Sequence, residues 1–377
     1  MKNITILKKL IWSVILLFAI TSCEDIVSYN DNYDDGLTSA GAPVIEKITA
    51  VADSAQVLSS ATLDEIISIY GSNLSQVTSI LFNDVQVDLS KVYAVNSRIV
   101  VPVPRQFPAT IDNKLTITTE LGSVTTDFTV TIPQLVVTGL YNEFATAGDT
   151  VIIAGKNFDL YGITIEDGVI ELNGQQLPIL EASSTSLSLK IPEETTDNSV
   201  LEISSQNVTD PIAVNFRDWG YRILYYDTDN GGMWSGADFL TDGSKSGDPE
   251  PLFGVEQFSR VVGTFDAWSW NVPFGGGFNL DDADIVANPQ DYYVKFEMTT
   301  KSNKSLSIGD LIFGNYTWNP GEGGIAFNTY GKWKTMAFEL TSVLSPASGW
   351  NGYSIVFQPS ADVDVDFSFC NLRIVKK

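Results

Sequence analysis

Two stretches of the chain, EIISIYGSNLSQVTSILFNDVQV (residues 65–87) and TVIIAGKNFDLYGITIEDGVIELNGQQL (residues 150–177), repeat one pattern. Each is followed by a short apolar run that ends in proline, SRIVVPVP (97–104) in the first copy and SLSLKIP (186–192) in the second. The alignment is fixed by four matched pairs of residues: Gly71 with Gly155, Asn73 with Asn157, Asn83 with Asn173, and Pro104 with Pro192. A repeat of this length indicates two copies of a whole domain rather than a solenoid.

Each copy consists of short alternating apolar runs bounded by glycine, asparagine and proline, which is typical of an all-β sandwich. The G-x-N-[LF] turn, the later [FL]-N-[DG] turn and the closing proline resemble IPT/TIG immunoglobulin-like domains. In the first copy Leu74 replaces the usual Phe and Asp84 replaces the usual Gly. The resemblance implies tandem immunoglobulin-like sandwiches, which we expect at residues 42–131 and 132–216.

Residues 217–377 have a different composition, because seven of the eight tryptophans of the chain lie in them. Seven or eight strand-like runs, such as YRILYYDT and VDVDFSFCNLRIV, follow one another without a helical stretch between them. This number and length of runs predict one antiparallel β-sandwich of jelly-roll type.

The N-terminus has the pattern of an export signal over residues 1–22, with three lysines ahead of the apolar run IWSVILLFAI. The following ITSC resembles the lipobox of bacterial lipoproteins, which implies cleavage before Cys23 and a lipid on its thiol; an ordinary secretory cleavage site is the alternative. Residues 23–41 are acidic and aperiodic and are expected to form a flexible tether. Glu24 and Asp25 resemble the signal that sends Bacteroidetes lipoproteins to the outer face of the outer membrane. Lipidation of Cys23 leaves Cys370 as the other cysteine, so no disulfide is expected.

The charge and the missing histidine narrow the classes of function. Removal of residues 1–22 takes away three lysines and leaves 19 basic against 46 acidic side chains, a net charge of −27. Such a surface disfavours nucleic acid, anionic lipid and acidic polymers as partners and favours a neutral or cationic ligand. The chain contains no histidine, which removes the commonest general base and every Ser-His or Cys-His pair.

The segment TFDAWSWNVPFGGGFN (264–279) sets Trp268 and Trp270 two residues apart. On a strand, residues with this spacing share one face, about 6.6 to 6.8 Å apart. Asp266 would share that face and Asn271 would follow closely, so that polar groups lie beside two indoles. Such a strip suits a neutral sugar polymer, since a pyranose stacks on an indole while polar groups take its hydroxyls. Pro273 and the glycines are expected to end the strand.

Other tryptophans of this region need separate interpretations. Trp234 and Trp318 lie next to glycine-rich loops, and Tyr316 repeats the two-residue spacing with Trp318. We therefore add Trp234 and Trp318 to the predicted sugar-stacking residues, against the alternative that tryptophans fill the core. Trp333 is expected to be structural and Trp219 to pack between domains, while the sequence does not decide Trp350.

Two further constellations are weaker. The stretch DTDNGG (227–232), with Asp238 beyond it, partly resembles a calcium loop but lacks the expected ligands at later positions. Carboxylate pairs for glycoside hydrolysis can be drawn among abundant acids, which selects none of them. The acids of this region that we considered are Asp229, Asp238, Asp266, Asp281, Asp282, Glu297 and Glu339. We predict neither a metal site nor a cofactor.

The whole order of segments resembles the surface glycan-binding proteins of Bacteroidetes polysaccharide-utilisation loci, of the SGBP-B type. This resemblance implies noncatalytic capture of a neutral polysaccharide or oligosaccharide by aromatic side chains of the last domain. It also implies a lipid-anchored position on the outer membrane, beside a glycan importer and a partner glycan-binding lipoprotein. A surface glycoside hydrolase or lyase and a structural adhesin remain the alternatives.

Overall fold

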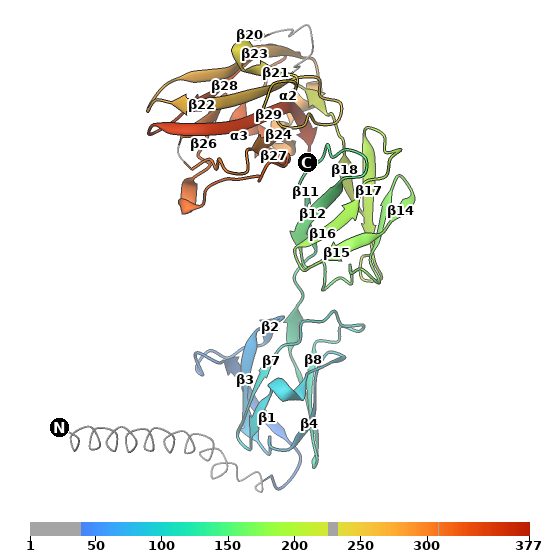
Figure 1. Ribbon diagram of the computed structural model, residues 1–377. Helices are drawn as coiled ribbons and strands as arrows, with labels where there is room; N and C mark the ends of the chain where they lie inside the picture. Colours follow the sequence, from blue (N-terminus) through green and yellow to red (C-terminus); the bar gives the residue numbers. More distant parts are fainter. Residues whose placement is uncertain (1–38, 225–232, 308) are drawn as a thin grey trace, which may run out of the picture. The chain divides into compact units, whose positions relative to one another are not determined.

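The computed structural model describes residues 39–224, 233–307 and 309–377 (Figure 1). The predicted signal peptide, Cys23, most of the predicted tether and the stretch DTDNGG with Asp229 lie outside the described residues. Contacts divide the chain into two compact units: unit 1 ends at Gln134, and unit 2 runs from Leu135 to Lys377. No helix within the described ranges has the length and apolar character needed to cross a membrane.

Unit 1 is a small sandwich of two four-stranded antiparallel sheets. The first has the order β1 (Val44–Ala50), β3 (Ile66–Ser72), β7 (Arg98–Pro102), β6 (Tyr93–Val95). The second has the order β5 (Val85–Gln86), β4 (Val77–Phe82), β8 (Lys114–Thr119), β9 (Gly122–Asp127), and β10 (Thr129–Thr131) pairs in parallel with β2 (Ser60–Thr62). Alternate residues such as Ile67, Ile69, Ile80 and Phe82 are buried between the sheets, as the period of two predicts.

The second immunoglobulin-like sandwich, within unit 2, has the same architecture. One sheet has the order β11 (Val136–Leu140), β12 (Thr150–Lys156), β16 (Ser186–Lys190), β15 (Ile179–Ala182). The other has the order β14 (Gln175–Leu177), β13 (Val169–Leu172), β17 (Ser199–Ser204), β18 (Ile212–Phe216). Its core includes Ile153, Phe158, Leu187, Leu201 and Phe216.

The residues that fixed the sequence repeat have matching roles in both sandwiches. A Cβ atom on Gly71 would lie 1.9 Å from the carbonyl oxygen of Val44, and one on Gly155 would lie 2.2 Å from that of Val136. Only glycine allows the neighbouring strand to come this close. The matched asparagines Asn73, Asn83, Asn157 and Asn173 all have positive φ, between 50° and 68°, a region that asparagine tolerates better than most residues.

The terminal domain is a sandwich of two larger sheets. One has the order β21 (Leu240–Thr241), β22 (Phe258–Phe265), β29 (Val363–Lys376), β24 (Tyr292–Thr300), β27 (Lys334–Glu339), with β19 (Tyr221–Arg222) also on β29. The other, here called the outer sheet, has the order β20 (Met233–Ser235), β23 (Asn271–Leu280), β28 (Gly349–Gln358), β25 (Asp310–Phe313), β26 (Tyr316–Trp318). Figure 1 shows β20, β23 and β28 side by side, with β22, β29 and β24 in the second layer. The all-β prediction is confirmed.

Short helices interrupt the terminal domain, where we expected none. They are α2 (Ala283–Ala287) and α3 (Leu340–Val343), and the 3-10 turns are Ala237–Phe239, Pro289–Asp291 and Glu322–Gly324, with one more at Leu89–Lys91 in unit 1. The Asp282 side chain caps α2 by accepting hydrogen bonds from the backbone N–H groups of Asp284 and Ile285. These turns are too short to show helical periodicity in the sequence.

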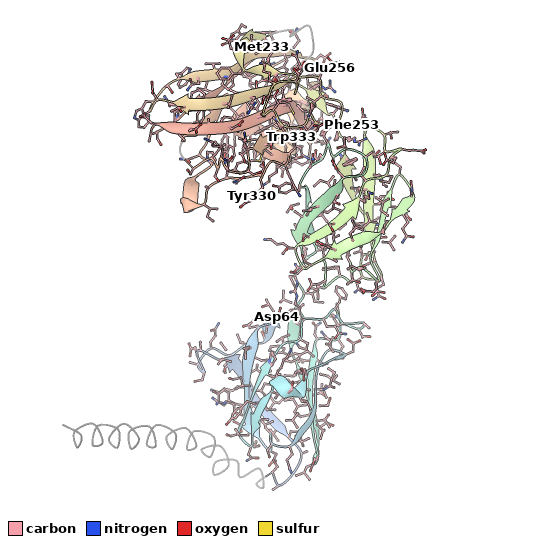
Figure 2. All side chains as sticks on the ribbon, in the orientation of Figure 1. Asp64, Met233, Phe253, Glu256, Tyr330 and Trp333 are labelled. Atoms are coloured by element: carbon pink, nitrogen blue, oxygen red, sulfur yellow. The ribbon has the colours of Figure 1, made fainter. Side chains whose placement is uncertain are left out.

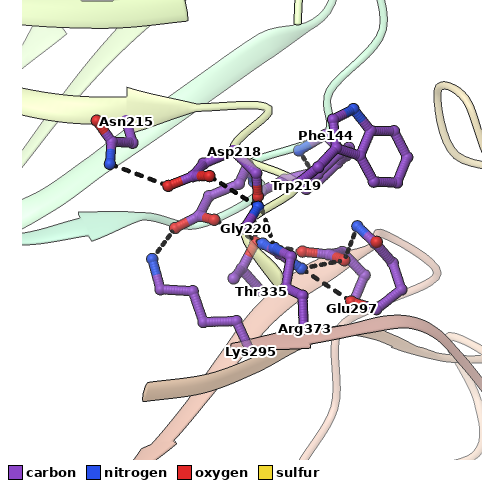
Figure 3. Close-up of polar contacts among 12 residues, drawn as sticks. Phe144, Asn215, Asp218, Trp219, Gly220, Lys295, Glu297, Thr335 and Arg373 are labelled. Carbon is purple, nitrogen blue, oxygen red and sulfur yellow. Dashed lines mark hydrogen bonds and ion pairs between the residues drawn. The ribbon is translucent and has the colours of Figure 1, made fainter. Parts of the chain in front are cut away.

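A buried ionic network joins the second immunoglobulin-like sandwich to the terminal domain (Figure 3). The guanidinium of Arg373, on β29, donates to Glu143 Oε2 at 2.6 Å and to Glu297 Oε2 at 2.9 Å. Lys295 pairs with the other oxygen of Glu143, and Arg373 Nε donates to the carbonyl of Asp218 at 2.8 Å. The ring of Phe144, from the second sandwich, belongs to the core cluster of the terminal domain. The two parts therefore share a core and a set of buried ion pairs.

Candidate functional site

Two indoles lie on a floor of glycines on the solvent face of the outer sheet. A Cβ on Gly275 would lie 2.7 Å from Nε1 of Trp234, and a Cβ on Gly277 would lie 2.5 Å from Cζ2 of Trp350. Gly352, on β28, comes within 3.2 Å of the Trp234 ring and 3.8 Å of the Trp350 ring by the same measure. Both rings therefore lie close against the backbone and adjoin above Gly352. We call these two indoles the platform.

The alternation of β23 and β28 explains this arrangement. Phe274 and Phe278 point into the core, so Gly275 and Gly277 between them lie on the opposite, outer face. Gly277 is directly opposite Gly352 in the register of the two strands. Glycine inside a strand costs about 0.5 to 1 kcal/mol relative to alanine, and here its missing side chain is what allows the indoles to lie against the backbone. Trp234 is 61% exposed and Trp350 is 55% exposed, so more than half of each residue remains open to solvent.

We expected from the sequence that the glycine run ends a strand, but it does not. Strand β22 ends at Phe265, residues 266–270 form a turn, and β23 then runs from Asn271 through Pro273 and all three glycines. The expectation of a strand through Trp268 and Trp270 is therefore wrong. Trp268 has a φ of 62°, so the two indoles cannot share a face in the way of a regular strand.

Trp268 and Trp270 nevertheless expose large rings, at 68% and 61%. Their turn is held firmly, because the Trp268 N–H donates to the carbonyl of Pro359 at 2.7 Å and the Ala267 N–H to the carboxylate of Asp362 at 2.9 Å. The turn leads directly into β23, the strand that carries Gly275 and Gly277. Gly277 follows Asn271 by six residues of strand, at about 3.3 Å each, so these two residues lie about 20 Å apart along β23.

Asp266 and Asn271 differ in what they can offer a ligand. Asp266 is exposed, and its backbone carbonyl accepts hydrogen bonds from the backbone and hydroxyl of Ser269. The amide nitrogen of Asn271 donates to Ser269 Oγ at 2.9 Å and to the carbonyls of Ser269 and Phe357. The nitrogen of Asn271 is therefore used to hold the turn.

Trp318 does not extend the platform. It lies on β26 opposite Leu311, whose side chain is buried in the core. Its ring packs against Phe338 at 5.9 Å and edge-on against Phe327 at 5.1 Å, and Tyr316 likewise packs on Phe338. The two-residue spacing of Tyr316 and Trp318 thus places both rings on the inner face, because the register of β25 and β26 turns that face toward the second sheet.

Two other tryptophans have the structural roles that we expected. Trp333 is 7% exposed, packs edge-on against Phe258 and donates from Nε1 to the carbonyl of Glu250 at 2.7 Å. Trp219 packs edge-on against Phe144 at the junction of the second sandwich and the terminal domain. The sequence did not decide whether Trp350 is exposed. The signal that could have found it is the alternation of glycines at 275 and 277, which marks a strand face without side chains.

Acidic side chains do not form a metal site within the described ranges, where no group of three or more metal-ligating side chains was found. Glu297 is fully buried in the ionic network, and burial raises its pKa to about 7 against the attraction of Arg373. Asp238 lies in the 3-10 turn Ala237–Phe239. Asp282 serves as a helix cap, and Glu339 pairs with Lys377.

Comparison with known proteins gives the chain its family. Residues 216–376 match the model described as the surface glycan-binding protein B xyloglucan binding domain, and residues 135–216 match the IPT/TIG domain. None of the curated proteins matches the chain.

Several solved structures resemble this one. The surface glycan-binding protein PbSGBP-B from Prevotella bryantii is 19% identical, with a TM-score of 0.54, over 89% of this chain and 99% of the other. The SGBP-B of a complex xyloglucan utilisation locus in Bacteroides uniformis is 15% identical, with a TM-score of 0.46, over 89% and 99%. The SGBP-B of the Bacteroides ovatus mixed-linkage glucan utilisation locus, solved with a mixed-linkage heptasaccharide, is 16% identical, with a TM-score of 0.27, over 82% and 72%. The family inferred from the sequence is confirmed, and the chain is a surface glycan-binding protein of the SGBP-B family with an IPT/TIG domain directly before its terminal domain.

Proposed function

We propose that the protein binds a neutral β-glucan without cleaving it, and that Trp234 and Trp350 form the centre of the binding surface. The observation that carries the proposal is the pair of exposed indoles that lie against Gly275, Gly277 and Gly352. A flat apolar surface of this kind matches the C–H face of a pyranose ring, and stacking on each ring contributes on the order of 1 kcal/mol beyond area burial.

The substrate class follows from charge and from the family. With 46 acidic side chains against 22 basic ones, the chain disfavours uronic-acid polymers. The domain model that matches residues 216–376 is described as xyloglucan-binding, and the Bacteroides ovatus relative was solved with a mixed-linkage oligosaccharide. We therefore propose xyloglucan first and mixed-linkage glucan second as the ligand of this chain.

Trp268 and Trp270 extend the surface at the start of β23 in this proposal, with Asp266 as a hydroxyl acceptor beside them. Trp318 and the amide nitrogen of Asn271 have no direct part, because one packs inward and the other is used within the turn. Residues 42–131 and 132–216 hold the terminal domain, residues 217–377, away from the cell surface. A lipid on Cys23 anchors the chain to the outer membrane, where an importer and a partner lipoprotein take up the captured glycan.

The test is a binding measurement on the mature chain with Cys23→Ser. Isothermal titration with xyloglucan, mixed-linkage glucan and a polygalacturonate would be compared with titrations of the Trp234→Ala and Trp350→Ala variants. We expect binding of a neutral glucan, weakened by about tenfold or more in each variant. Binding within twofold of the parent in both variants would refute the platform, and new reducing ends after prolonged incubation would instead establish a hydrolase or lyase.

A further inference from the structure

A hollow of about 800 Å³ opens beside the Trp350 end of the platform. Its walls come from the outer sheet through Gly277, Asn279 and Trp350, and from the segment Trp219–Arg222. The second immunoglobulin-like sandwich contributes Asp197. Because Trp350 belongs to the platform and also lines this hollow, the two surfaces are continuous. The volume lies within the range of about 300 to 1,000 Å³ that is usual for ligand sites.

The wall on the side of the second sandwich is a fixed aromatic surface. The indole N–H of Trp219 donates to Asp197 Oδ2 at 2.9 Å, across the junction of the two parts. The Trp219 ring contacts Phe144 edge-on at 4.6 Å between centroids, and the guanidinium carbon of Arg222 lies 3.7 Å from its centroid. The buried pair of Arg373 with Glu143 crosses the same junction. The wall therefore exists before any ligand arrives.

Polar groups stand around the hollow next to Trp350. Asn279 is exposed on the outer face of β23, directly opposite Trp350 in the register. The carboxylate of exposed Asp281 accepts a hydrogen bond from the Tyr221 hydroxyl at 3.0 Å, and a carboxylate has further lone pairs for other donors. Aromatic walls with a few amide and carboxylate groups are what a sugar ring with its hydroxyls requires. The residues that line the hollow include two carboxylates, Asp197 and Asp281, and one guanidinium, Arg222, and this balance favours a neutral sugar over an acidic one.

We propose that this hollow is a further sugar subsite, which receives the residues of a neutral glucan that extend past Trp350, and that the second immunoglobulin-like sandwich is part of the binding site. The inference rests on the proposed function, because the glycan must first lie on the platform. It assigns to the second sandwich a role in binding beyond that of a spacer. It also explains why Asp197 holds the Trp219 indole.

The test compares short and long ligands on the mature chain with Cys23→Ser. Xyloglucan oligosaccharides of graded length, from a single repeating unit upward, would be titrated into the parent chain, Asn279→Ala, Asp197→Ala and the double variant. Asp210→Ala, an exposed acid of the same sandwich outside the hollow, is the matched control. We expect the double variant to lose about tenfold in affinity for the longer oligosaccharides, or about 1.4 kcal/mol, because it lacks two polar side chains of the hollow. The shortest ligand should bind unchanged within about twofold.

The outcomes separate the two proposals. Equal affinity of the parent and the double variant for every length, with Trp234→Ala still defective, would overturn the subsite and leave the platform standing. An equal loss at every length would also overturn it, because a subsite beyond Trp350 cannot affect a ligand too short to reach it. Normal binding by Trp234→Ala would overturn the proposed function itself.

Discussion

Replacement of Trp234 by alanine should weaken glucan binding by about 25-fold. A tryptophan side chain presents up to about 250 Å², so at 61% exposure about 150 Å² of Trp234 is open to solvent. A pyranose on the open side covers about half of this, roughly 75 Å², which at about 25 cal/mol per Å² amounts to about 2 kcal/mol. At 1.4 kcal/mol for each factor of ten, that energy corresponds to roughly 25-fold in Kd.

The same substitution should leave the chain folded. The covered part of Trp234, roughly 100 Å², contributes at most about 2.5 kcal/mol to the free energy of unfolding. For a unit of this size such a loss lowers the Tm by roughly 5 to 10 °C. Differential scanning calorimetry therefore checks that the variant used for titration is native at the working temperature.

The assay is isothermal titration of a xyloglucan oligosaccharide into the parent chain, Trp234→Ala, Trp234→Phe and Tyr330→Ala. Tyr330 is a matched control, because it is 72% exposed in the same domain but lies at the end opposite Met233, the neighbour of Trp234 (Figure 2). Trp234→Phe should lose less than Trp234→Ala, since a smaller ring keeps part of the stack, and Tyr330→Ala should bind normally. A Trp234→Ala variant that is folded and binds within twofold of the parent would refute the reasoning.

Three further predictions concern the glycine floor and the junction. Gly275→Ala should weaken binding by about five- to tenfold, because the new Cβ would displace the Trp234 ring. Gly352→Ala should weaken binding less in the same titration, because the closest contact of its Cβ is at 3.2 Å. Glu143→Ala should lower the free energy of unfolding of unit 2 by about 3 to 5 kcal/mol, since it leaves the buried Arg373 guanidinium without one of its two carboxylates. Urea unfolding followed by tryptophan fluorescence measures this loss. A midpoint equal to that of the parent would contradict the role of the network. Burial raises the pKa of Glu297 from its ordinary 4.5 to about 7, so between these values the folded chain holds a proton that the unfolded chain has released, and the free energy of unfolding should fall as the pH rises through this window. Glu297→Gln should flatten that dependence, and an unchanged slope in urea titrations at several pH values would show that another group is responsible.

Much of the fold was predictable because it depends on short-range chemistry. The turns at Asn73 and Asn157 and the close approaches at Gly71 and Gly155 need particular residues, so the repeat could be recognised from their spacing. Alternation of apolar residues likewise marks strands wherever one face is buried, as in the last segment, which forms β29 with Cys370 in its buried centre. The concentration of tryptophan in the last 161 residues identified the domain that carries the candidate site.

The candidate site itself was only partly predictable. Trp234 was selected from a neighbouring glycine-rich loop, which is not the reason it is exposed; the reason is its position over Gly275 on an adjacent strand. Trp318 was selected on the same ground and packs inward, because strand register and not local composition decides which face of β26 is outward. A glycine run reads as a turn in the sequence, and only its pairing with β28 turns it into a strand with a bare face.

The sequence by itself determined the all-β class, the internal repeat, the acidic and histidine-free character of the chain and the family to which it belongs, since each depends on residue types and their spacing along the chain. The tertiary structure decided which indoles face solvent and which lie together. Trp234 and Trp350 are far apart in the sequence and meet only because β20 and β28 flank the same glycine-bearing strand. The physical reason is that a side chain's neighbours across a sheet are set by long-range pairing, and no local pattern contains that information.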